Sequence, residues 1–358
     1  MDRTNFETNI SNTDPCNITD KTCGMLERGK REKRLSKIRI LATVAVFCLG
    51  LFIGCGQREE PAALRIGGLK GPTSMGLVFL QEQAQSGQAE QEYEFTMAVG
   101  ADELLPLMIK GELDIALIPA NVASVLYGKT EGGISVIDIN TLGVLYMVSG
   151  DDSIDSMESL RGRTIYLTGK GTTPDYVLRY LLMANGIPVE ECTLEYRSEA
   201  TEVAALLAEQ PQAIGLLPQP FVTAACAQNE NLRVVLDMNE QWNLAQGEGG
   251  SSMVTGVTVV RNAFLREHPE AVKIFLTEHA ASVQAIQEDL DRGAQLVVEA
   301  GIIAREPIAR KAIPFCNITY LDGEDMRRVL SGYLEVLYEL EPAAVGGALP
   351  GEDFYYIP

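Results

Sequence analysis

Histidine and aromatic residues are scarce in this chain of 358 residues. Only His268 and His279 occur, and aromatic residues make up 6% of the sequence. Neither histidine has a nucleophile or carboxylate partner at an instructive spacing, so histidine-based catalysis and a histidine-rich metal site are not expected. Basic residues are also few, 29 against 49 acidic ones, which gives a net charge of −20. Nonspecific binding to nucleic acid is therefore not expected.

Residues 1–54 have the pattern of an export leader. Seven basic residues lie between Arg28 and Arg39, and an uncharged, mostly apolar run follows from Ile40 to Gly54. Fifteen residues is shorter than the roughly 20 that a membrane span needs. The run ends at Gly54-Cys55, which resembles the processing site of bacterial lipoproteins. A plain N-terminal membrane anchor is the alternative.

The lipoprotein interpretation predicts a leader over residues 1–54 and a tether over 55–61. Cys55 would then be the lipid acceptor, carrying palmitate or a similar chain. Met25 would begin a leader of ordinary length. The folded part would retain three cysteines, Cys192, Cys226 and Cys316. Their scattered spacing fits neither a disulfide framework nor a metal site, so we expect them to be buried apolar residues.

From Leu64 onward, short apolar runs alternate with longer amphipathic stretches, which is typical of an α/β protein. Residues 64–69 and 164–168 read as strands, each followed by a glycine-containing loop and a helix. The first of these helices is expected to start near Met75 and the second to run through Met183. A further helix is expected from Pro269 to about Asp289. No GxSxG, HExxH, paired CxxC or phosphate-loop motif occurs, so no catalytic residue, metal ligand or cofactor is predicted.

The chain contains a weak internal repeat. Residues 95–122 align with 194–221 at an offset of 99, and both segments end in a strand closed by proline, 115–119 and 214–218. Two similar lobes would place equivalent strand ends at equivalent points, and ligands of open α/β sheets bind outside the carboxyl ends of the strands. We therefore expect a small-molecule site where four loops converge. These loops are 70–75, 119–122, 169–175 and 218–221.

Within these loops, helix starts at Thr73 or Ser74 and at Thr173 would offer backbone N–H groups to an anion, unless the threonines simply cap their helices. Asp175 is expected to cap its own helix. Amide and aromatic groups would complete the site, although Phe221 reads equally well as core, and Trp242 as either a cleft lip or a core residue. The predicted ligand-binding residues are Lys70, Gly71, Pro72, Thr73, Ser74, Met75, Asn121, Thr141, Thr172, Thr173, Gln219 and Phe221. Lys70, and Lys170 at the matched position, read more readily as solvated lysines than as ligand contacts.

Several segments together resemble the substrate-binding lipoproteins of ABC importers, in the nitrate/sulfonate/taurine and thiamine-precursor (pyrimidine) branch. The resemblance runs from about residue 62 to the C-terminus. The segments that carry it are 69–77 (LKGPTSMGL), 111–116 (GELDIA), 140–146 (NTLGVLY), 266–272 (REHPEAV), 312–318 (AIPFCNI) and 345–356 (VGGALPGEDFYY).

The resemblance implies a bilobed periplasmic-binding-protein fold (type II), with two Rossmann-like lobes joined by two crossovers. We place the crossovers near 147–150 and 253–256, which makes lobe 1 residues 62–147 plus 256–358 and lobe 2 residues 148–255. The implied protein is a monomeric, lipid-anchored receptor on the outer face of the membrane. It would close around an oxyanion, sulfonate or pyrimidine-like molecule and deliver it to an ABC permease.

Two other functions are weighed against this one. An enzyme of the menaquinone pathway or a pyrimidine synthase resembles binding proteins of the same fold, but the leader argues against cytoplasmic biosynthesis, and the two histidines and scattered cysteines do not match the synthase. A ligand-sensing ectodomain would need a second membrane segment and a cytoplasmic domain, and the sequence contains neither pattern.

Overall fold

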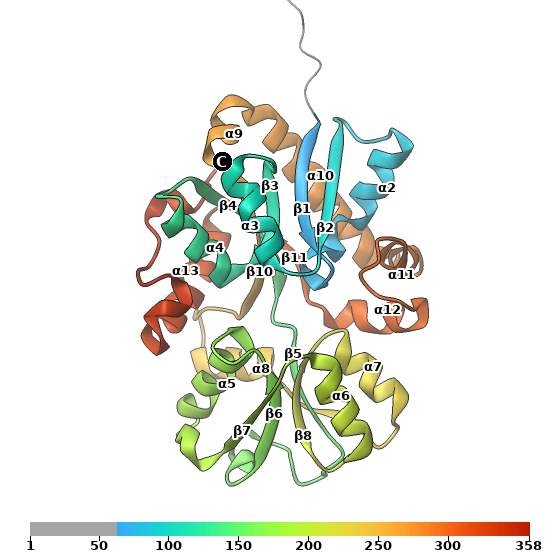
Figure 1. Cartoon of the computed structure of the whole chain (residues 1–358), viewed down its shortest axis with the longest axis vertical. Helices are drawn as coiled ribbons and strands as arrows, with labels where there is room; N and C mark the ends of the chain where they lie inside the picture. The colour runs from blue at the N-terminus through green and yellow to red at the C-terminus, as the bar shows by residue number, and fades with distance from the viewer. Residues whose placement is uncertain (1–62) are drawn as a thin grey trace, which may run out of the picture. The chain divides into compact units, whose positions relative to one another are not determined.

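Two separate β-sheets organise residues 63–358, the part of the chain that the computed structural model describes (Figure 1). The predicted leader (1–54), the tether (55–61) and the acylation site Cys55 lie outside these residues. Helices cover both sheets, so the chain has the α/β architecture that its alternating pattern predicts. No helix among residues 63–358 combines the length and apolar character needed to cross a bilayer.

The first sheet has six strands in the order β11-β4-β10-β3-β1-β2. β1 runs parallel to β2 and β3, whereas β10 is antiparallel to β3 and β4, and β11 is antiparallel to β4. The central strands are almost wholly buried, which explains their apolar composition. The strands are β1 (Leu64–Leu69), β2 (Tyr93–Ala98), β3 (Ile115–Pro119), β4 (Ile134–Leu142), β10 (Val254–Arg261) and β11 (Ile318–Leu321).

The helices around the six-stranded sheet come from both ends of the described chain. α10 begins at Pro269, where the missing N–H of proline costs nothing, and it ends near the predicted boundary. The region predicted to begin a helix near Met75 starts earlier, as the 3₁₀-helix η1 (Pro72–Leu77). The helices are η1, α2 (Val78–Ser86), α3 (Ala101–Lys110), α4 (Ala120–Lys129), α9 (Asn262–Glu267), α10 (Pro269–Glu288), α11 (Leu290–Glu299), α12 (Glu306–Ala312), η4 (Ile313–Phe315), α13 (Gly323–Leu340), η5 (Pro342–Val345) and η6 (Glu352–Phe354).

The second sheet has five strands in the order β7-β6-β8-β5-β9. β6 is parallel to β7 and β8, and β5 is antiparallel to β8 and β9. The strands are β5 (Leu145–Ser149), β6 (Thr164–Thr168), β7 (Thr193–Arg197), β8 (Ile214–Pro218) and β9 (Arg233–Asp237). Their helices are η2 (Met157–Leu160), α5 (Thr173–Ala184), η3 (Val189–Glu191), α6 (Ala200–Glu209), α7 (Phe221–Gln228) and α8 (Met238–Gln246).

The two sheets repeat one unit. In the first, Ile66 pairs with Ile115, and in the second, Ile165 pairs with Ile214, so both partners shift by the same 99 residues. β10 in the first sheet takes the place of β5 in the second, because each is antiparallel to the strand that ends in proline. The structure therefore reproduces the offset that the sequence match indicated. We call the parts built on the two sheets the six-stranded lobe and the five-stranded lobe.

The chain passes between the sheets twice. It leaves the six-stranded sheet after Leu142 and enters the five-stranded sheet at Leu145, and it returns between Gln246 and Val254. The boundary predicted at residue 147 falls inside β5, so the change of sheet lies closer to the N-terminus. The residues of β4 and β5 form a nearly continuous buried run, which gives no sequence signal of where one sheet gives way to the other.

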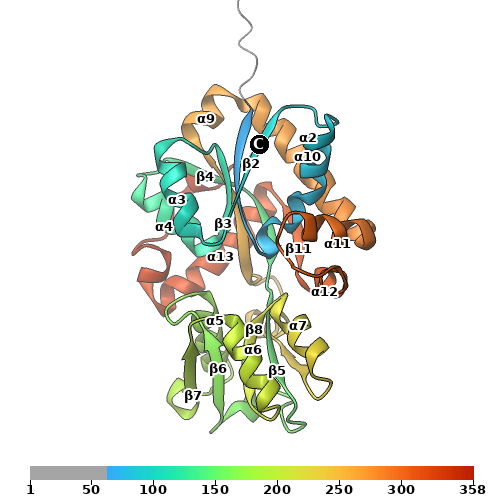
Figure 2. The same cartoon turned by 45° about the vertical axis from the view of Figure 1, so that its right-hand side comes forward.

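Buried apolar residues form a continuous cluster from one lobe to the other. Trp242 of α8 is fully buried, with ring centroids 4.6 Å from Tyr180 of α5 and 5.4 Å from Tyr333 of α13. Its Nε1 donates a hydrogen bond to the Ser251 carbonyl at 3.1 Å. Trp242 is therefore a core residue that joins α13 to the five-stranded lobe, and not an exposed lip. Figure 2 shows α13 beside α5, and the two helices are in contact.

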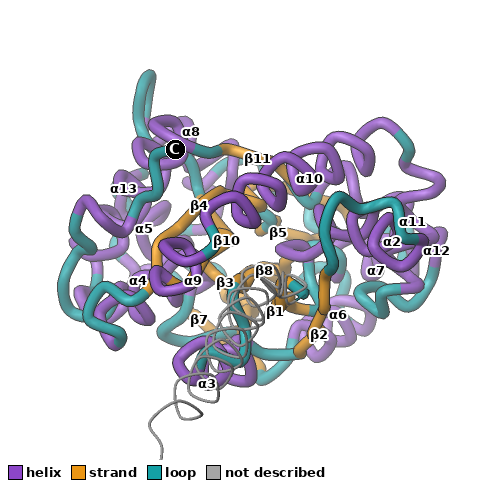
Figure 3. The backbone as a smooth tube through the Cα atoms, turned by 90° about the horizontal axis from the view of Figure 1, so that it is seen from above, coloured by secondary structure: helices purple, strands orange, loops and turns teal. Residues whose placement is uncertain are grey.

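The lobes also meet at a second place. Figure 3 shows α13, α5 and α8 on one side of the molecule and α7, α11 and α12 on the other. Contacts between α12 and α7 close this second side. Tyr146 of β5 adds a polar link there, since its hydroxyl donates to the Phe315 carbonyl at 2.8 Å. Two flanking contacts thus enclose the carboxyl ends of the central strands.

Candidate functional site

The loop after β1 forms η1, which buries two hydroxyl-bearing side chains and one methionine. Thr73 is 6% exposed, whereas Ser74 and Met75 are fully buried. The residue before η1 is Gly71, and no side chain caps this helix. Within residues 63–358, the hydroxyls of Thr73 and Ser74 have no hydrogen-bond partner. They therefore do not act as helix caps, the alternative that the sequence left open.

Two neighbouring residues near the end of β4 present similar groups. Thr141 is buried, and its hydroxyl has no partner within the described chain; nor does the side-chain oxygen of Asn140. Across the sheet, Thr141 pairs with Gly256 of β10. A Cβ atom at Gly256 would lie 2.4 Å from Cγ2 of Thr73 and 2.5 Å from Oδ1 of Asn140. Glycine at this position lets η1 and β4 approach each other closely.

These groups lie where a ligand is expected. β1 and β3 are parallel, Pro119 at the carboxyl end of β3 pairs with Gly256, and η1 directly follows β1. Ligand sites in α/β proteins lie at this edge of the sheet. A buried polar atom without a partner costs about 1–3 kcal/mol. Several such atoms at one edge of the sheet therefore indicate a site where water or a ligand supplies the missing hydrogen bonds.

A second predicted pair bridges the lobes. Thr173, the first residue of α5, donates from its hydroxyl to Oδ1 of Asn121 in α4 at 3.5 Å. The buried ring of Tyr333 in α13 lies beside Thr173, and burial raises the pKa of the Tyr333 hydroxyl. The structure thus brings two predicted residues from different lobes together, and adds a tyrosine that sequence reasoning missed.

The loop before α5 differs from the loop before η1. Thr172, not the predicted Thr173, occupies the N-cap position, and no side chain makes a cap hydrogen bond. The Thr172 hydroxyl instead donates to the Gly169 carbonyl at 2.6 Å. Thr172 and Lys170 are exposed, and Lys170 Nζ lies 5.5 Å from the Tyr196 ring centroid. Sequence reasoning misplaced the cap by one residue because both positions carry threonine.

Asp175 occupies the anion position that the sequence offered to a ligand. One of its carboxylate oxygens accepts from the backbone N–H of Gly171 at 2.8 Å. The other accepts from Arg179 at 2.6 Å and from the Tyr196 hydroxyl at 2.8 Å. The protein's own carboxylate therefore lies in the first turn of α5, where its charge favours the helix dipole. Its backbone hydrogen bond goes to the loop N–H of Gly171 and not to a helix N–H, so Asp175 does not form the expected cap.

The remaining predicted residues lie towards the edges of the site. Lys70 is exposed, and Gly71 and Pro72 are half-buried. Gln219 is buried, but its side-chain oxygen already accepts from the Thr223 hydroxyl at 2.8 Å, and its backbone N–H donates to the carbonyl of Val144 at 2.9 Å. These contacts assign Gln219 a structural role at the first crossover.

Phe221 faces a separate apolar pocket on the side where α7 meets α12. The pocket measures about 230 Å³. Its lining combines Pro220 and residues of α7 with the loop between α11 and α12 and the first turn of α12, namely Pro220, Phe221, Ala224, Ile302, Ile303, Ala304, Arg305 and Ile308. The structure therefore places Phe221 in the contact between lobes, apart from the polar groups of η1 and β4.

Asn239 is another residue that the sequence did not single out. Its side-chain oxygen is buried and has no partner among the described residues. A Cβ at Gly143 would lie 2.7 Å from this oxygen and 2.2 Å from Cε of Met253. Gly143 and Met253 belong to the two crossovers, so Asn239 lies where both pass. A lone asparagine at a helix start gives no sequence signal of such a position.

His279 has a carboxylate partner in the folded chain, although neither histidine has one at an instructive spacing in the sequence. Its Nδ1 lies 3.2 Å from Oδ2 of Asp138 in β4, and both side chains are fully buried. The partner lies 141 residues away in the sequence, which no local spacing could indicate. His268, by contrast, is exposed at the start of α10, as expected.

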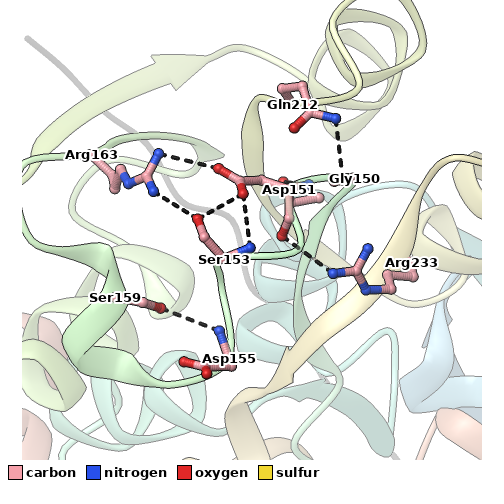
Figure 4. Close-up of polar contacts among 9 residues, drawn as sticks. Gly150, Asp151, Ser153, Asp155, Ser159, Arg163, Gln212 and Arg233 are labelled. Carbon is pink, nitrogen blue, oxygen red and sulfur yellow. Dashed lines mark hydrogen bonds and ion pairs between the residues drawn. The ribbon is translucent and has the colours of Figure 1, made fainter.

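A polar cluster at the opposite edge of the five-stranded sheet serves a structural purpose (Figure 4). Asp151 follows β5, and hydrogen bonds from Ser153, together with Arg163, lower the pKa of its carboxyl. Arg233 donates to the backbone carbonyl of Asp151 at 3.3 Å. β5 runs antiparallel to β8, so this turn lies at the amino end of β8, away from the carboxyl ends where ligands bind.

Comparison with known proteins reveals similarity to solved structures in fold. No protein-family model matches the sequence, and no curated protein matches it. A solved structure described as an ABC transporter from Parabacteroides distasonis superimposes with a TM-score of 0.69 at 25% identity, over 83% of this chain and 98% of that one. The periplasmic aliphatic sulphonate binding protein SsuA from Escherichia coli gives 0.67 at 14% identity, over 83% and 93%.

A Candida albicans protein with the generic periplasmic binding protein structural fold gives a TM-score of 0.52 at 14% identity, over 82% of this chain and 93% of that one. The chain has the periplasmic-binding-protein fold. Its structural neighbours are mostly substrate-binding proteins of ABC transporters, in agreement with the resemblance found in the sequence. Among the polar groups described above, Asn239 lies beside Gly143 and Met253 of the two crossovers, whereas those of η1 and β4 lie at the carboxyl edge of the six-stranded sheet.

Proposed function

We propose that this protein is the solute-binding receptor of an ABC importer and holds a small molecule between its two lobes. The observation that carries the proposal is the set of buried, unpartnered side-chain oxygens of Thr73, Asn140, Thr141 and Asn239 near the crossovers and the carboxyl ends of the central strands. A ligand that hydrogen-bonds these atoms gains affinity from groups that would otherwise lack partners.

The proposed ligand is an oxyanion, a sulfonate or a pyrimidine-like molecule. The solved neighbours that bind sulfonates support this range, because they share the fold with this chain. The proposed contacts begin with Thr73, Ser74 and Thr141, and extend to Asn121 and Thr173 at the lobe boundary. Lys70 and Thr172 would contribute little, because both side chains are exposed.

Binding would be coupled to movement of the lobes about residues 143–144 and 247–253, where the chain passes between the sheets. The closed receptor would then dock on a membrane permease. We further propose that the protein acts as a monomer outside the cytoplasm and is tethered to the membrane by a lipid on Cys55. Acylation is supported by the basic segment, apolar run and cysteine of the N-terminal sequence.

Titration calorimetry on the purified full-length protein tests the receptor function. At least one compound among candidate sulfonates, oxyanions and pyrimidines should bind. Its binding should lower the radius of gyration that solution scattering measures. The proposal fails if no compound binds and scattering with a small-molecule extract of cells shows no compaction.

The anchor needs a separate test. Cys55→Ala should abolish incorporation of a fatty-acid analogue without changing the melting temperature, because Cys55 precedes the folded part. Undiminished labelling of Cys55→Ala would rule out this attachment site.

A further inference from the structure

Four buried side chains form a hydrogen-bonded series that ends at the candidate ligand site. The series starts at His279 in α10, whose Nδ1 lies 3.2 Å from Oδ2 of Asp138. Thr258 of β10 donates from its hydroxyl to Oδ1 of Asp138 at 2.8 Å. Asn140 in turn donates from Nδ2 to Oγ1 of Thr258 at 3.1 Å. All four side chains are buried, with at most 1% of any residue exposed.

The direction of these bonds fixes the orientation of the Asn140 amide. A threonine hydroxyl has a single hydrogen, and Thr258 gives it to the Asp138 carboxylate. Thr258 can then only accept from Asn140, so the Asn140 amide must turn its NH₂ group towards Thr258. Its carbonyl oxygen is left on the other side, where it has no partner among residues 63–358. A flipped amide would place two acceptors against each other.

The Asn140 end of this series lies among the residues of the proposed site. Oδ1 of Asn140 and the side chain of Thr73 meet over Gly256, because a Cβ there would be within 2.5 Å of both. No lysine or arginine is buried among residues 63–358. The buried acidic residues and histidine of this part are Asp114, Asp138, Asp175, Glu278 and His279. A ligand at this position therefore meets a fixed acceptor at Asn140, hydroxyls of Thr73 and Thr141 that can donate or accept, and no buried lysine or arginine.

We propose that Asn140, held by Thr258, Asp138 and His279, selects ligands that donate a hydrogen bond. The selected class is small, uncharged molecules with an N–H or O–H group, and acceptor-only anions such as sulfonates and nitrate are disfavoured. This inference rests on the proposed receptor function and chooses among its ligand classes. Asn140 would contact the ligand, whereas Thr258, Asp138 and His279 are positioning residues.

The experiment measures binding by calorimetry to the full-length protein at neutral pH. One probe set contains cytosine and 4-aminopyrimidine, which are uncharged and carry N–H donors. The other contains ethanesulfonate and nitrate, which only accept. The wild-type protein is expected to bind a member of the first set and neither anion.

The variants separate orientation from simple structural damage. Thr258→Val keeps the shape but releases the Asn140 amide, so affinity for the donor probe should fall about 3- to 10-fold. Thr258→Ser restores the hydroxyl and should recover affinity to within about 2-fold. Thr277→Val makes the same chemical change on the exposed face of α10 and is the matched control. If Thr258→Val does not fold, Asn140→Ala removes the acceptor directly and should cause a similar loss.

Each outcome has one meaning. Binding of ethanesulfonate or nitrate without binding of either donor probe would overturn the inference and leave the receptor function standing. Equal affinity of Thr258→Val and Thr258→Ser for the donor probe would also overturn it. Absence of binding to all four probes would count against the proposed function in these ligand classes, and the inference would fall with it.

Discussion

The first loops of the two lobes follow equivalent strands but present different surfaces. After β1, η1 buries Thr73 and Ser74 without hydrogen-bond partners for their hydroxyls. After β6, Thr172 is exposed, and Asp175 takes up the backbone N–H of Gly171. The first loop leaves two buried hydroxyls without hydrogen-bond partners among residues 63–358, whereas the second loop forms its hydrogen bonds within the protein.

This difference shows what a structural repeat preserves. The strand register repeats at an offset of 99 residues, so the backbone positions correspond. The side chains on those positions do not correspond in role, because a single carboxylate, Asp175, is enough to neutralise one helix start. We therefore assign most ligand contacts to the six-stranded lobe. Asn239 and Thr173 are the contacts that we propose from the five-stranded lobe, at its boundary with the other lobe.

The largest expected effect comes from filling the space beneath η1. Gly256→Ala would force a Cβ against Thr73 and Asn140, so the free energy of unfolding should fall by about 1–3 kcal/mol and ligand affinity should fall with it. Leu145 is its counterpart in the five-stranded lobe, where it pairs with Pro218 and a side chain is accommodated.

Chemical denaturation and calorimetry measure both effects. Gly128→Ala is the control, since a Cβ at Gly128 would meet no atom within 4 Å, and alanine is the better helix former in α4. Wild-type stability in Gly256→Ala would mean that η1 does not pack on β10 as described.

Removing the self-neutralising carboxylate should affect stability and not binding. Asp175→Asn weakens hydrogen bonds to Gly171, Arg179 and Tyr196, so the free energy of unfolding should fall by about 1–2 kcal/mol. Asp325→Asn disrupts an exposed pair with Arg328 and should change it by no more than about 0.5 kcal/mol. A large loss of ligand affinity in Asp175→Asn would place the α5 loop in the site.

Threonine hydroxyls in the two loops provide a direct comparison of binding. Thr73→Val removes a buried hydroxyl that has no partner in the protein, so ligand affinity should fall about 2- to 10-fold while the melting temperature stays equal or rises. Thr172→Val changes an exposed residue and should leave affinity unaltered. Calorimetry with a compound that binds the wild-type protein would reveal the opposite pattern if the ligand contacts the second loop.

The smallest expected effects are those of the two matched lysines. Lys70 and Lys170 are both exposed, so Lys70→Met and Lys170→Met should each change ligand affinity less than about 2-fold. The comparison is made at low and high salt, because a charge contact with an anion would be strongest at low salt. A clear loss at low salt would favour an anionic ligand.

The sequence predicts the local elements of the fold well. Strands 64–69, 115–119, 164–168 and 214–218 have the predicted bounds, because apolar runs ending in proline, glycine or polar residues delimit them. The sequence did not predict where β10 and β11 lie within the first sheet. Both strands come from the C-terminal third and pair with β4, so their positions depend on contacts that no local pattern encodes.

Part of the candidate site could be predicted from strand ends and from one segment of the family resemblance. Thr73, Ser74 and Asn121 follow recognisable strand ends, and Thr141 lies in a segment that carries the family resemblance. Asn140 was missed because one polar residue within a buried strand has no distinguishing spacing. The partnership of Asp138 with His279 joins a strand to a distant helix, so only the packed structure could identify it.

Hydrogen exchange with and without a compound that binds the wild-type protein tests the central claim most directly, because one sample reports on both loops. The account predicts that ligand slows exchange in peptides covering residues 71–77 and 139–143 and leaves residues 169–172 unchanged. Slower exchange at 169–172 without a change at 71–77 would contradict it and move the ligand site to the five-stranded lobe.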